Sequence, residues 1–289
     1  MYATIDQIVL EGGFAVTAVC EILGVSRSGF YTWRDETETN REREDRALVP
    51  LVCEVFWRHK RRYGARRIAE ELKGRGKPCG VARVAKLLKN QGLRAIQPKS
   101  FKPKTTDSRH TLGYSPNLLL NRAGPMQINE VWVADITYIP LRETGFGYLA
   151  LLMDLFSRRI VGWSFLEEMG ERLVLGTLTE AIRNRQPGPG LIHHSDRGGQ
   201  YAGGQLRGVL RRAGMRQSMS RAQNCYDNAF SESCFGTIKT ELEMADYENS
   251  FHARRELFEY ICYYNQQRKH SSLGYVTPAE FETQQTVQN

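Results

Sequence analysis

The chain has 289 residues, which is enough for two or three compact units with a substantial buried core. Its six cysteines form no CxxC pair and no short Cys/His spacing, so the pattern excludes the common zinc sites and favours reduced thiols inside a cell. No apolar run approaches the roughly 18 residues of a membrane span, and Met1 is not followed by a signal segment. We therefore expect an intracellular protein with no membrane partner.

The net charge of +8 is unevenly distributed along the chain. Residues 1–125 carry 23 Lys and Arg against 13 Asp and Glu, a net +10, whereas residues 126–289 carry 17 against 19, a net −2. Within residues 58–104 there are 16 basic residues but only two acids, Glu70 and Glu71. Such a density favours a polyanion partner, nucleic acid in the first place, over the alternative of a solvated charged face.

Residues 1–45 predict a helix-turn-helix unit with a charged linker. Apolar residues at helical spacing end at Gly24, and Ser26 is a good N-cap for a second helix. In a helix-turn-helix the early residues of the second helix face the DNA groove, and here they are Arg27 and Ser28. An ordinary helical hairpin is the alternative.

Residues 46–96 predict a basic helical domain that binds DNA. The preceding run at 35–46 has no apolar face and is interpreted as linker or a solvated helix start. Helices are expected over 65–72 and 81–90, separated by a glycine-rich turn. Four arginines cluster near the start of the first of these helices, and phosphate contacts by several of them would make binding salt-dependent. They are Arg61, Arg62, Arg66 and Arg67.

Residues 97–125 carry Pro and Lys with little periodicity and predict a basic extended linker.

Residues 126–245 predict an α/β core. The run WVADITYIP at 132–140 and two later apolar runs are typical of a three-stranded meander. A helix over 171–185 and a strand over 191–194 follow, which favours a mixed sheet with flanking helices. Residues 246–289 predict a helical tail whose last five residues are frayed.

Three acids lie on separate predicted elements. Asp135 lies within the first strand, Asp196 follows the strand at 191–194, and Glu232 lies in a later helix, 36 positions after Asp196. Three carboxylates can hold two divalent cations about 4 Å apart and leave positions open for a phosphate. A cap or turn role is the alternative for Asp135. Asp154 is its rival, although a structural ion pair or a turn is the simpler interpretation there.

Other polar residues surround this predicted site. Lys239 lies seven residues after Glu232 on the same helical face, and Asn228 lies one turn before it, so both are predicted DNA or ligand contacts. Of His193 and His194, one is expected to point into the core, and a direct metal role is the minor alternative. In the tail, Arg268, Lys269 and His270 could contact DNA, with packing inside the tail as an equal alternative.

Four motifs, WVADITYI, HSDRGGQY, CYDNAFSESCFGTIKTE and YNQQRKHSSLGYVTPAEF, resemble in this order the signatures of the insertion-sequence-three family of transposases, in the retroviral-integrase superfamily. The resemblance implies a ribonuclease-H-like core, a catalytic triad of Asp135, Asp196 and Glu232, and two Mg²⁺ ions that Mn²⁺ can replace. It also implies cleavage and strand transfer at terminal inverted repeats of double-stranded DNA, by a homo-oligomer on paired ends. The expected location is the bacterial cytoplasm, with the nucleoid.

Two departures from that pattern are visible. The chain lacks the His/His/Cys/Cys zinc module of retroviral integrases, and it has no sustained heptad repeat. The active enzyme of the family is usually a frameshift fusion, so the chain resembles the downstream product, and an upstream helix-turn-helix and leucine-zipper protein is an expected partner. Two other functions stay open, a ribonuclease-H-type nuclease and a DNA-binding regulator with an inactive core.

Overall fold

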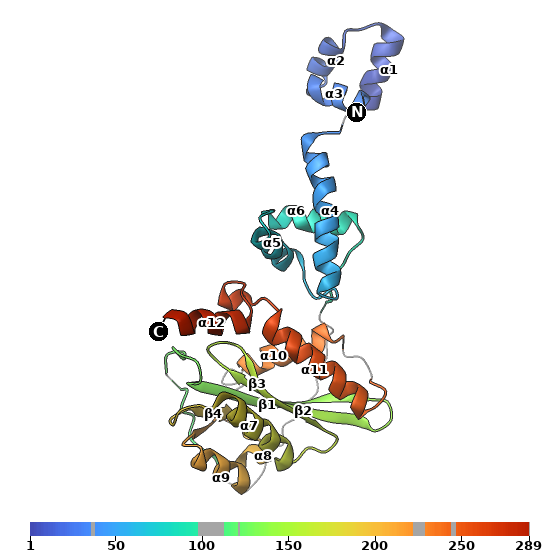
Figure 1. Ribbon diagram of the computed structural model, residues 1–289. Coiled ribbons are helices and arrows are strands. Elements are labelled where there is room, and N and C mark those ends of the chain that lie inside the picture. Colours follow the sequence, from blue (N-terminus) through green and yellow to red (C-terminus); the bar gives the residue numbers. More distant parts are fainter. Residues whose placement is uncertain (36–37, 98–112, 121, 222–228, 244–246, 289) are drawn as a thin grey trace. The chain divides into compact units, whose positions relative to one another are not determined.

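A computed structural model (Figure 1) gives the arrangement of most of the chain. The described residues are 1–35, 38–97, 113–120, 122–221, 229–243 and 247–288, without the side chains of 229–232, 287 and 288. Most of the linker expected at 97–125 lies outside them. The chain divides into two compact units, Met1–Ala95 and Ile96–Asn289.

The first unit begins with three short helices, α1 (Tyr2–Gly12), α2 (Val16–Ile22) and α3 (Arg27–Arg34). The hydroxyl of Ser26 accepts a hydrogen bond from the backbone N–H of Gly29, so Ser26 is the N-cap that the sequence predicts. The small core of these helices consists of Ile5, Val19, Cys20 and Phe30.

A second group of helices follows, α4 (Asn40–Arg58), α5 (Ala65–Gly74) and α6 (Val81–Asn90). The last two match the predicted helices. The charged run at 35–46, interpreted as linker or a solvated helix start, is helical from Asn40 onward, and the predicted boundary at residue 45 falls inside α4. Thr39 and Glu42 form a capping box at its start. Arg83 of α6 bonds to Asp45 at 2.5 Å, so the charged run gains partners from another helix.

The second unit is built on a mixed five-stranded sheet in the order β3-β2-β1-β4-β5. The predicted meander is confirmed, since β1, β2 and β3 pair antiparallel, while β4 runs parallel to β1 and β5 parallel to β4. Its strands are β1 (Val131–Leu141), β2 (Gly145–Asp154), β3 (Ile160–Leu166), β4 (Ile192–Ser195) and β5 (Arg216–Met219). This strand order is that of the expected ribonuclease-H-like core.

Helices cover both faces of this sheet (Figure 1). Trp132 and Ala134 of β1 belong to a core with α7 (Glu171–Arg185), α8 (Gly199–Ala202) and α9 (Gly204–Arg212). Val131 and Val133 belong to the opposite core, with α10 (Ala229–Glu241) and α11 (Ser250–Gln266). Because side chains alternate along a strand, Asp135 lies on the α10 side of the sheet.

One glycine allows α7 to approach the edge of the sheet. A Cβ atom on Gly162 of β3 would lie 2.5 Å from the backbone oxygen of Thr177 in α7. Real Cβ atoms do not come this close to a carbonyl oxygen, so any larger residue would push the helix away from the strand.

The tail is more ordered than the sequence predicts. A short 3₁₀ turn (Ser271–Leu273) leads to α12 (Pro278–Gln288), which includes most of the five residues expected to fray. Glu282 anchors this helix, because its carboxylate accepts hydrogen bonds from Ser157 at 2.8 Å, Arg159 at 2.6 Å and Arg185 at 2.8 Å. Within the described part of the chain, none of the helices combines the length and the apolar character that crossing a membrane requires.

Candidate active site

Asp135 lies in the middle of β1 and is partly buried. Its Oδ1 accepts a hydrogen bond from the backbone N–H of Ile136 at 2.8 Å. Two groups of α10 respond to its charge. Burial raises the pKa of Cys234 to about 11, and Asp135 adds to this increase. Burial lowers the pKa of Lys239, and Asp135 opposes this decrease. Asp135 therefore lies beside α10.

Asp196 lies one residue beyond β4, the parallel neighbour of β1. The last paired positions of the two strands are Val133 and His194, and the two aspartates each lie two residues further along. Adjacent strands are about 4.8 Å apart, so the register brings both acids to the same level at one end of the pairing. The Oδ1 atom of Asp196 accepts a hydrogen bond from Gly198 N–H at 2.9 Å, which fixes the carboxylate in the turn.

Glu232 lies in α10, although its side chain is outside the described residues. The same helix buries Cys234 and Ile238 against the core that contains Val131 and Val133 of β1. Among the side chains that the structure describes, no three His, Cys, Asp or Glu residues are grouped so that they could hold a metal ion. The structure thus groups two of the three predicted acids and the backbone of the helix that carries the third.

Lys239 lies on the side of α10 that faces β1. Its ammonium nitrogen is 4.9 Å from the centre of the Tyr138 ring, and Tyr138 is three residues after Asp135 on the strand. At 100° per residue, Lys239 is about 20° from Glu232 around the helix. A cation therefore lies next to the candidate site. Asn228 lies outside the described residues.

Asp154 has the turn role that the sequence favoured. It is fully buried, and its carboxylate accepts hydrogen bonds from the backbone N–H groups of Asn129, Phe156 and Ser157 at 2.7, 3.0 and 2.9 Å. Burial raises its pKa, although these hydrogen bonds oppose the increase. The carboxylate thus holds the chain reversal after β2.

Both histidines of β4 are buried, whereas the sequence predicted this for one of them. His194 shares a 2.8 Å hydrogen bond with the hydroxyl of Ser218. Burial, together with the neighbouring His194, lowers the pKa of His193 to about 4, so its imidazole is neutral near pH 7.

Arg268 and His270 are packed inside the tail, with 5% and 8% of their surface exposed. A guanidinium nitrogen of Arg268 lies 2.8 Å from the carboxylate of Glu241, at the end of α10. The hydroxyl of Tyr260 donates to the same carboxylate at 3.0 Å. The predicted DNA contacts of Arg268 and His270 are thus corrected to the packing alternative, because a buried ion pair leaves no cation at the surface.

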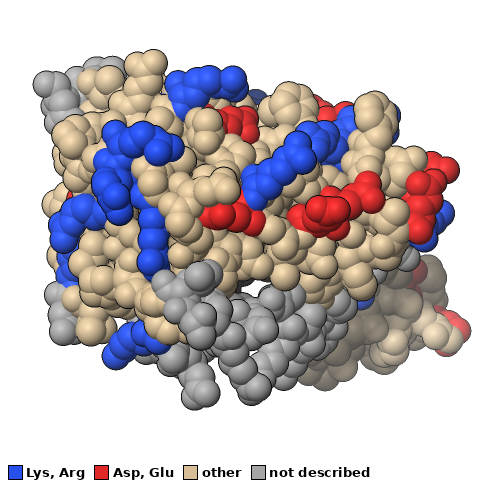
Figure 2. Space-filling view, turned by 90° about the horizontal axis from the view of Figure 1, so that it is seen from below, with Lys and Arg blue, Asp and Glu red and all other residues tan. Residues whose placement is uncertain are grey.

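The predicted DNA contacts of the first unit lie largely at the surface. Arg27 and Ser28 are exposed in the first turn of α3, and Arg61 and Arg66 are exposed at the α4–α5 turn and in α5. Two of this set are half-buried, Arg62 and Arg67, and the Arg67 guanidinium lies 5.5 Å from the centre of the Tyr63 ring. Figure 2 shows a different face, that of the second unit on the side of α7, α8 and α9, where Lys and Arg gather at the left, away from most of the acids.

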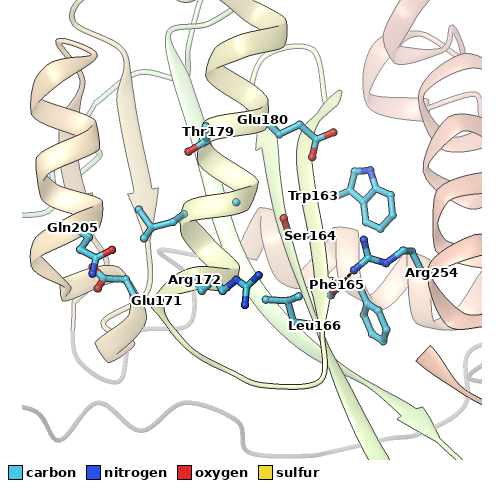
Figure 3. Close-up of a pocket in the computed structure, with 12 residues that line it drawn as sticks. Trp163, Ser164, Phe165, Leu166, Glu171, Arg172, Thr179, Glu180, Gln205 and Arg254 are labelled. Carbon is cyan, nitrogen blue, oxygen red and sulfur yellow. Dashed lines mark hydrogen bonds between the residues drawn. The ribbon is translucent and has the colours of Figure 1, made fainter. Parts of the chain in front are cut away.

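A groove of about 800 Å³ lies elsewhere in the second unit, beside the edge strand β3 (Figure 3). Trp163 and Phe165 of β3, Arg172 and Glu180 of α7 and Arg254 of α11 line it. The described residues of the groove include none of the predicted catalytic acids, so it is separate from the candidate active site.

Sequence reasoning missed Tyr201, in α8. Its pKa is raised well above the usual value, first by burial and then by the charges of Asp135 and Asp196. The available signal was its place in the HSDRGGQY motif, five residues after Asp196.

Comparisons with known proteins agree with this arrangement. Models of the integrase core domain match residues 125–225 and 213–278, and a model of an HTH-like domain matches residues 42–101. A 31 kDa protein of insertion element IS600 from Shigella sonnei is 41% identical over 265 residues, which cover 91% of this chain and 97% of that protein. Transposase InsF for insertion sequence IS3A from Escherichia coli (strain K12) is 38% identical over 279 residues, which cover 94% of this chain and 95% of that protein. The chain belongs to the IS3 family of transposases.

As a member of the IS3 family, the chain is an insertion-sequence DNA transposase, an enzyme of the polynucleotidyl transferase class. Among solved structures it is similar to the HTLV-2 integrase catalytic core domain in complex with magnesium, with a TM-score of 0.42 and 15% identity over 54% of this chain and 98% of that one. A simian T-cell lymphotropic virus intasome chain gives a TM-score of 0.45 and 14% identity, over 74% of this chain and 70% of that one. These scores are low, and the fold assignment rests on the strand order and the family.

Proposed function

We propose that Asp135, Asp196 and Glu232 hold two Mg²⁺ ions, replaceable by Mn²⁺, and that this site cleaves and joins DNA strands at terminal inverted repeats. The main support is the register of β1 and β4, which brings Asp135 and Asp196 to one level on neighbouring strands. Two partly buried carboxylates so close together repel each other unless a cation neutralises them. Hard oxygen ligands of this kind suit Mg²⁺ and Mn²⁺.

Bound cations at this position would supply a metal-activated oxygen nucleophile and stabilise the leaving oxygen in an in-line displacement. The side chains of the transposase itself perform the positioning. Asp135 and Asp196 are fixed by hydrogen bonds from the backbone N–H groups of Ile136 and Gly198. Lys239, beside Tyr138, supplies a positive charge for a DNA phosphate next to the acids.

We further propose double-stranded DNA as the partner of the first unit. The exposed cations in and near α5 suit phosphates, and the first turn of α3 suits base edges. The proposed contacts are Arg27, Ser28, Arg61, Arg62, Arg66 and Arg67, together with Asn228 and Lys239 of the second unit. The family further suggests homo-oligomeric assembly on paired ends and an upstream helix-turn-helix and leucine-zipper partner.

The test is strand transfer on a labelled duplex that carries the element's end sequence, in Mg²⁺, with wild type and Glu232→Gln. The variant should bind DNA normally and lose joining by at least about a thousandfold, since about 4 kcal/mol of transition-state stabilisation corresponds to that factor. Glu248→Gln, which changes an exposed carboxylate outside α10, is the matched control and should stay active.

Joined products from Glu232→Gln at the wild-type rate would refute the role of this carboxylate. If the wild type joins no DNA, the upstream-frame protein is added, and joining that then appears identifies the missing partner. Cleavage of RNA in RNA–DNA hybrids without any DNA joining would instead identify a ribonuclease-H-type nuclease.

A further inference from the structure

One segment of the second unit is rich in arginine and contains no acids. Residues 197–226 include six arginines but no Lys, Asp or Glu, although residues 126–289 as a whole carry a net charge of −2. The segment begins directly after Asp196 and includes α9 and β5. On the face shown in Figure 2, Lys and Arg side chains gather away from most of the acids. Positive charge is thus concentrated locally in a unit that is slightly acidic overall.

The fold brings three of these arginines, and a fourth from α7, to one end of the sheet. The backbone N–H of Gly190, after α7, donates to the carbonyl oxygen of Gly214, after α9, at 2.8 Å. The N–H of the first residue of β5 donates to the carbonyl oxygen of Leu191 at 2.8 Å. The last turns of both helices and the start of β5 therefore lie together. Their exposed arginines, here called the arginine patch, are Arg183, Arg211, Arg212 and Arg216.

The arginine patch differs from the paired arginines of the same unit. Among the residues that the structure describes, none of its four side chains forms an ion pair with a carboxylate. By contrast, Arg185, in the same turn of α7 as Arg183, is half-buried and pairs with Glu282 at 2.8 Å. Exposed cations that are not neutralised by neighbouring acids attract a polyanion. The patch therefore suits the phosphates of nucleic acid.

We propose that the arginine patch binds the phosphates of a second DNA duplex, the target to which strand transfer joins the element's end. The inference rests on the proposed strand transfer, because that reaction brings two duplexes to one catalytic unit. It adds to this unit a DNA surface separate from Lys239, at the opposite end of β4 from the candidate acids.

The position of the patch allows one duplex to reach both the patch and the acids. Arg216 pairs with Ile192 of β4, and Asp196 lies four residues beyond Ile192. At about 3.3 Å per residue, the two levels are about 13 Å apart along the sheet. Base pairs of DNA follow each other at about 3.4 Å, so this separation corresponds to about four base pairs. A duplex whose reacting phosphate lies at the acids can thus extend to the patch.

The kind of contact favours the target over the element's end. Phosphate contacts hold a duplex without reading its sequence, whereas base contacts read it. The patch consists of the last turns of two helices and the start of an edge strand, and the start of α9 is occupied by Glu171, which accepts a hydrogen bond from the N–H of Leu206 at 3.0 Å. Sequence reading is better suited to α3 of the first unit. A surface that holds only phosphates suits a duplex of variable sequence.

A structural role is the competing explanation for three of the four arginines. Cations in the last turn of a helix interact favourably with the helix dipole, and Arg183, Arg211 and Arg212 lie in such turns. Arg216 lies outside a helix, so this explanation does not include it. DNA affinity separates the two explanations, because a purely structural role would reduce stability and leave DNA affinity unchanged.

The experiment is a fluorescence anisotropy titration of the full chain without divalent cations. The chain is first saturated with an unlabelled duplex that carries the element's end sequence, and a labelled duplex of unrelated sequence is then added at several salt concentrations. For Arg211→Gln/Arg216→Gln we expect the salt slope of this second binding to fall by about 1.8, as for two lost phosphate contacts. Its Kd in 0.1 M salt should rise at least about tenfold, while the Kd for the end duplex stays within about twofold.

Arg142→Gln/Arg255→Gln is the matched control, because it removes the same charge from two exposed arginines of the same unit. Arg142 follows Leu141, which is ten residues, or about 33 Å, from the start of β1 beside β4. Arg255 belongs to α11, on the other face of the sheet from α9. The Kd of this variant for the second duplex should stay within about twofold of the wild type.

The outcomes separate this proposal from the proposed function. Wild-type affinity of Arg211→Gln/Arg216→Gln for the second duplex, an equal loss in the control variant, or no second duplex on the loaded wild type would each overturn the proposal. A loss confined to the end duplex would overturn the assignment to the target. Glu232→Gln should bind both duplexes normally, so a failure of the metal site appears only in its strand-transfer assay and leaves the binding result intact.

Discussion

The two units of this transposase use arginine in opposite ways. In the first unit Arg27, Arg61 and Arg66 are exposed, and their positive charge lies at the surface. In the second unit Arg185 and Arg268 are largely buried, and each is paired with a carboxylate. A buried cation is committed to its partner because desolvation is costly. Arginine thus gives the first unit exposed positive charge, which suits the proposed DNA contacts, and, apart from the arginine patch, gives the second unit internal ion pairs.

The largest effect that distinguishes the units should come from Arg268→Ala. It leaves the carboxylate of Glu241 buried without this partner, and breaking such a pair costs about 3–5 kcal/mol. Arg58→Ala is the control, because the Arg58–Glu54 pair of the first unit is about half exposed and should contribute less than about 1 kcal/mol. Urea unfolding of both variants gives the two values. Equal losses in the free energy of unfolding would contradict the idea that burial determines how much an ion pair contributes to stability.

An intermediate effect should come from pH, through His193. Its folded pKa of about 4 lies below the value of 6.5 for an exposed histidine, so the unfolded chain binds the proton more readily. Stability is therefore fully present above about pH 6.5 and is lost as the pH falls toward 4. This histidine alone should remove roughly 2 kcal/mol between pH 7 and pH 5.

The variant His193→Phe keeps a ring in the core and removes this titration. Its unfolding free energy, measured by urea denaturation at several pH values, should depend less on pH by that amount. His252→Phe, which removes a histidine from α11 outside the sheet, is the control variant. An unchanged slope in His193→Phe would rule out the buried imidazole as the source.

The smallest effect on stability should come from Arg66→Gln in the first unit. We expect unfolding to change by less than about 0.5 kcal/mol, because Arg66 is exposed. The salt dependence of DNA binding should fall by about 0.9 in slope, as for one lost phosphate contact. Fluorescence anisotropy at several salt concentrations measures it.

Arg83→Gln sharpens this comparison within one unit. Arg83 pairs with Asp45 and Glu44, so its loss should reduce stability and leave the salt slope unchanged. If the salt dependence of DNA binding changed for Arg83→Gln and not for Arg66→Gln, Arg83 would be the DNA contact and Arg66 would not.

Local patterns in the sequence predicted the parts of the fold that depend on local chemistry. Alternating apolar residues predicted the meander, and helical spacing predicted α5, α6 and α7 within about two residues. The start of α4 was left open, because a run without an apolar face is compatible with a linker and with a solvated helix. What stabilises it is a capping box at Thr39 and ion pairs from Arg83, 38 residues later. The burial of Arg268 likewise depends on Glu241, 27 residues earlier.

In the candidate site, too, local features were predicted from the sequence and contacts between distant residues were not. The spacing and surroundings of Asp135 and Asp196 were visible in the sequence, as was the helical phase of Lys239. Their common level on the sheet was not, because it depends on a parallel register between strands about 60 residues apart. Tyr201 was missed for a related reason, since only the packing of α8 on the sheet buries its ring with Trp132.

The anchoring of α12 by Glu282 also has a consequence in time. Glu282 follows Arg185 by 97 residues and Arg159 by 123 residues. At about 5–20 residues per second, a ribosome needs roughly 5–20 s to travel from Arg185 to Glu282. At the start of that interval β1, β2, β3 and α7 have been synthesised, but the carboxylate that neutralises the two arginines has not. The catalytic unit therefore closes late in synthesis, and a polypeptide released before α12 lacks the charge that completes its core.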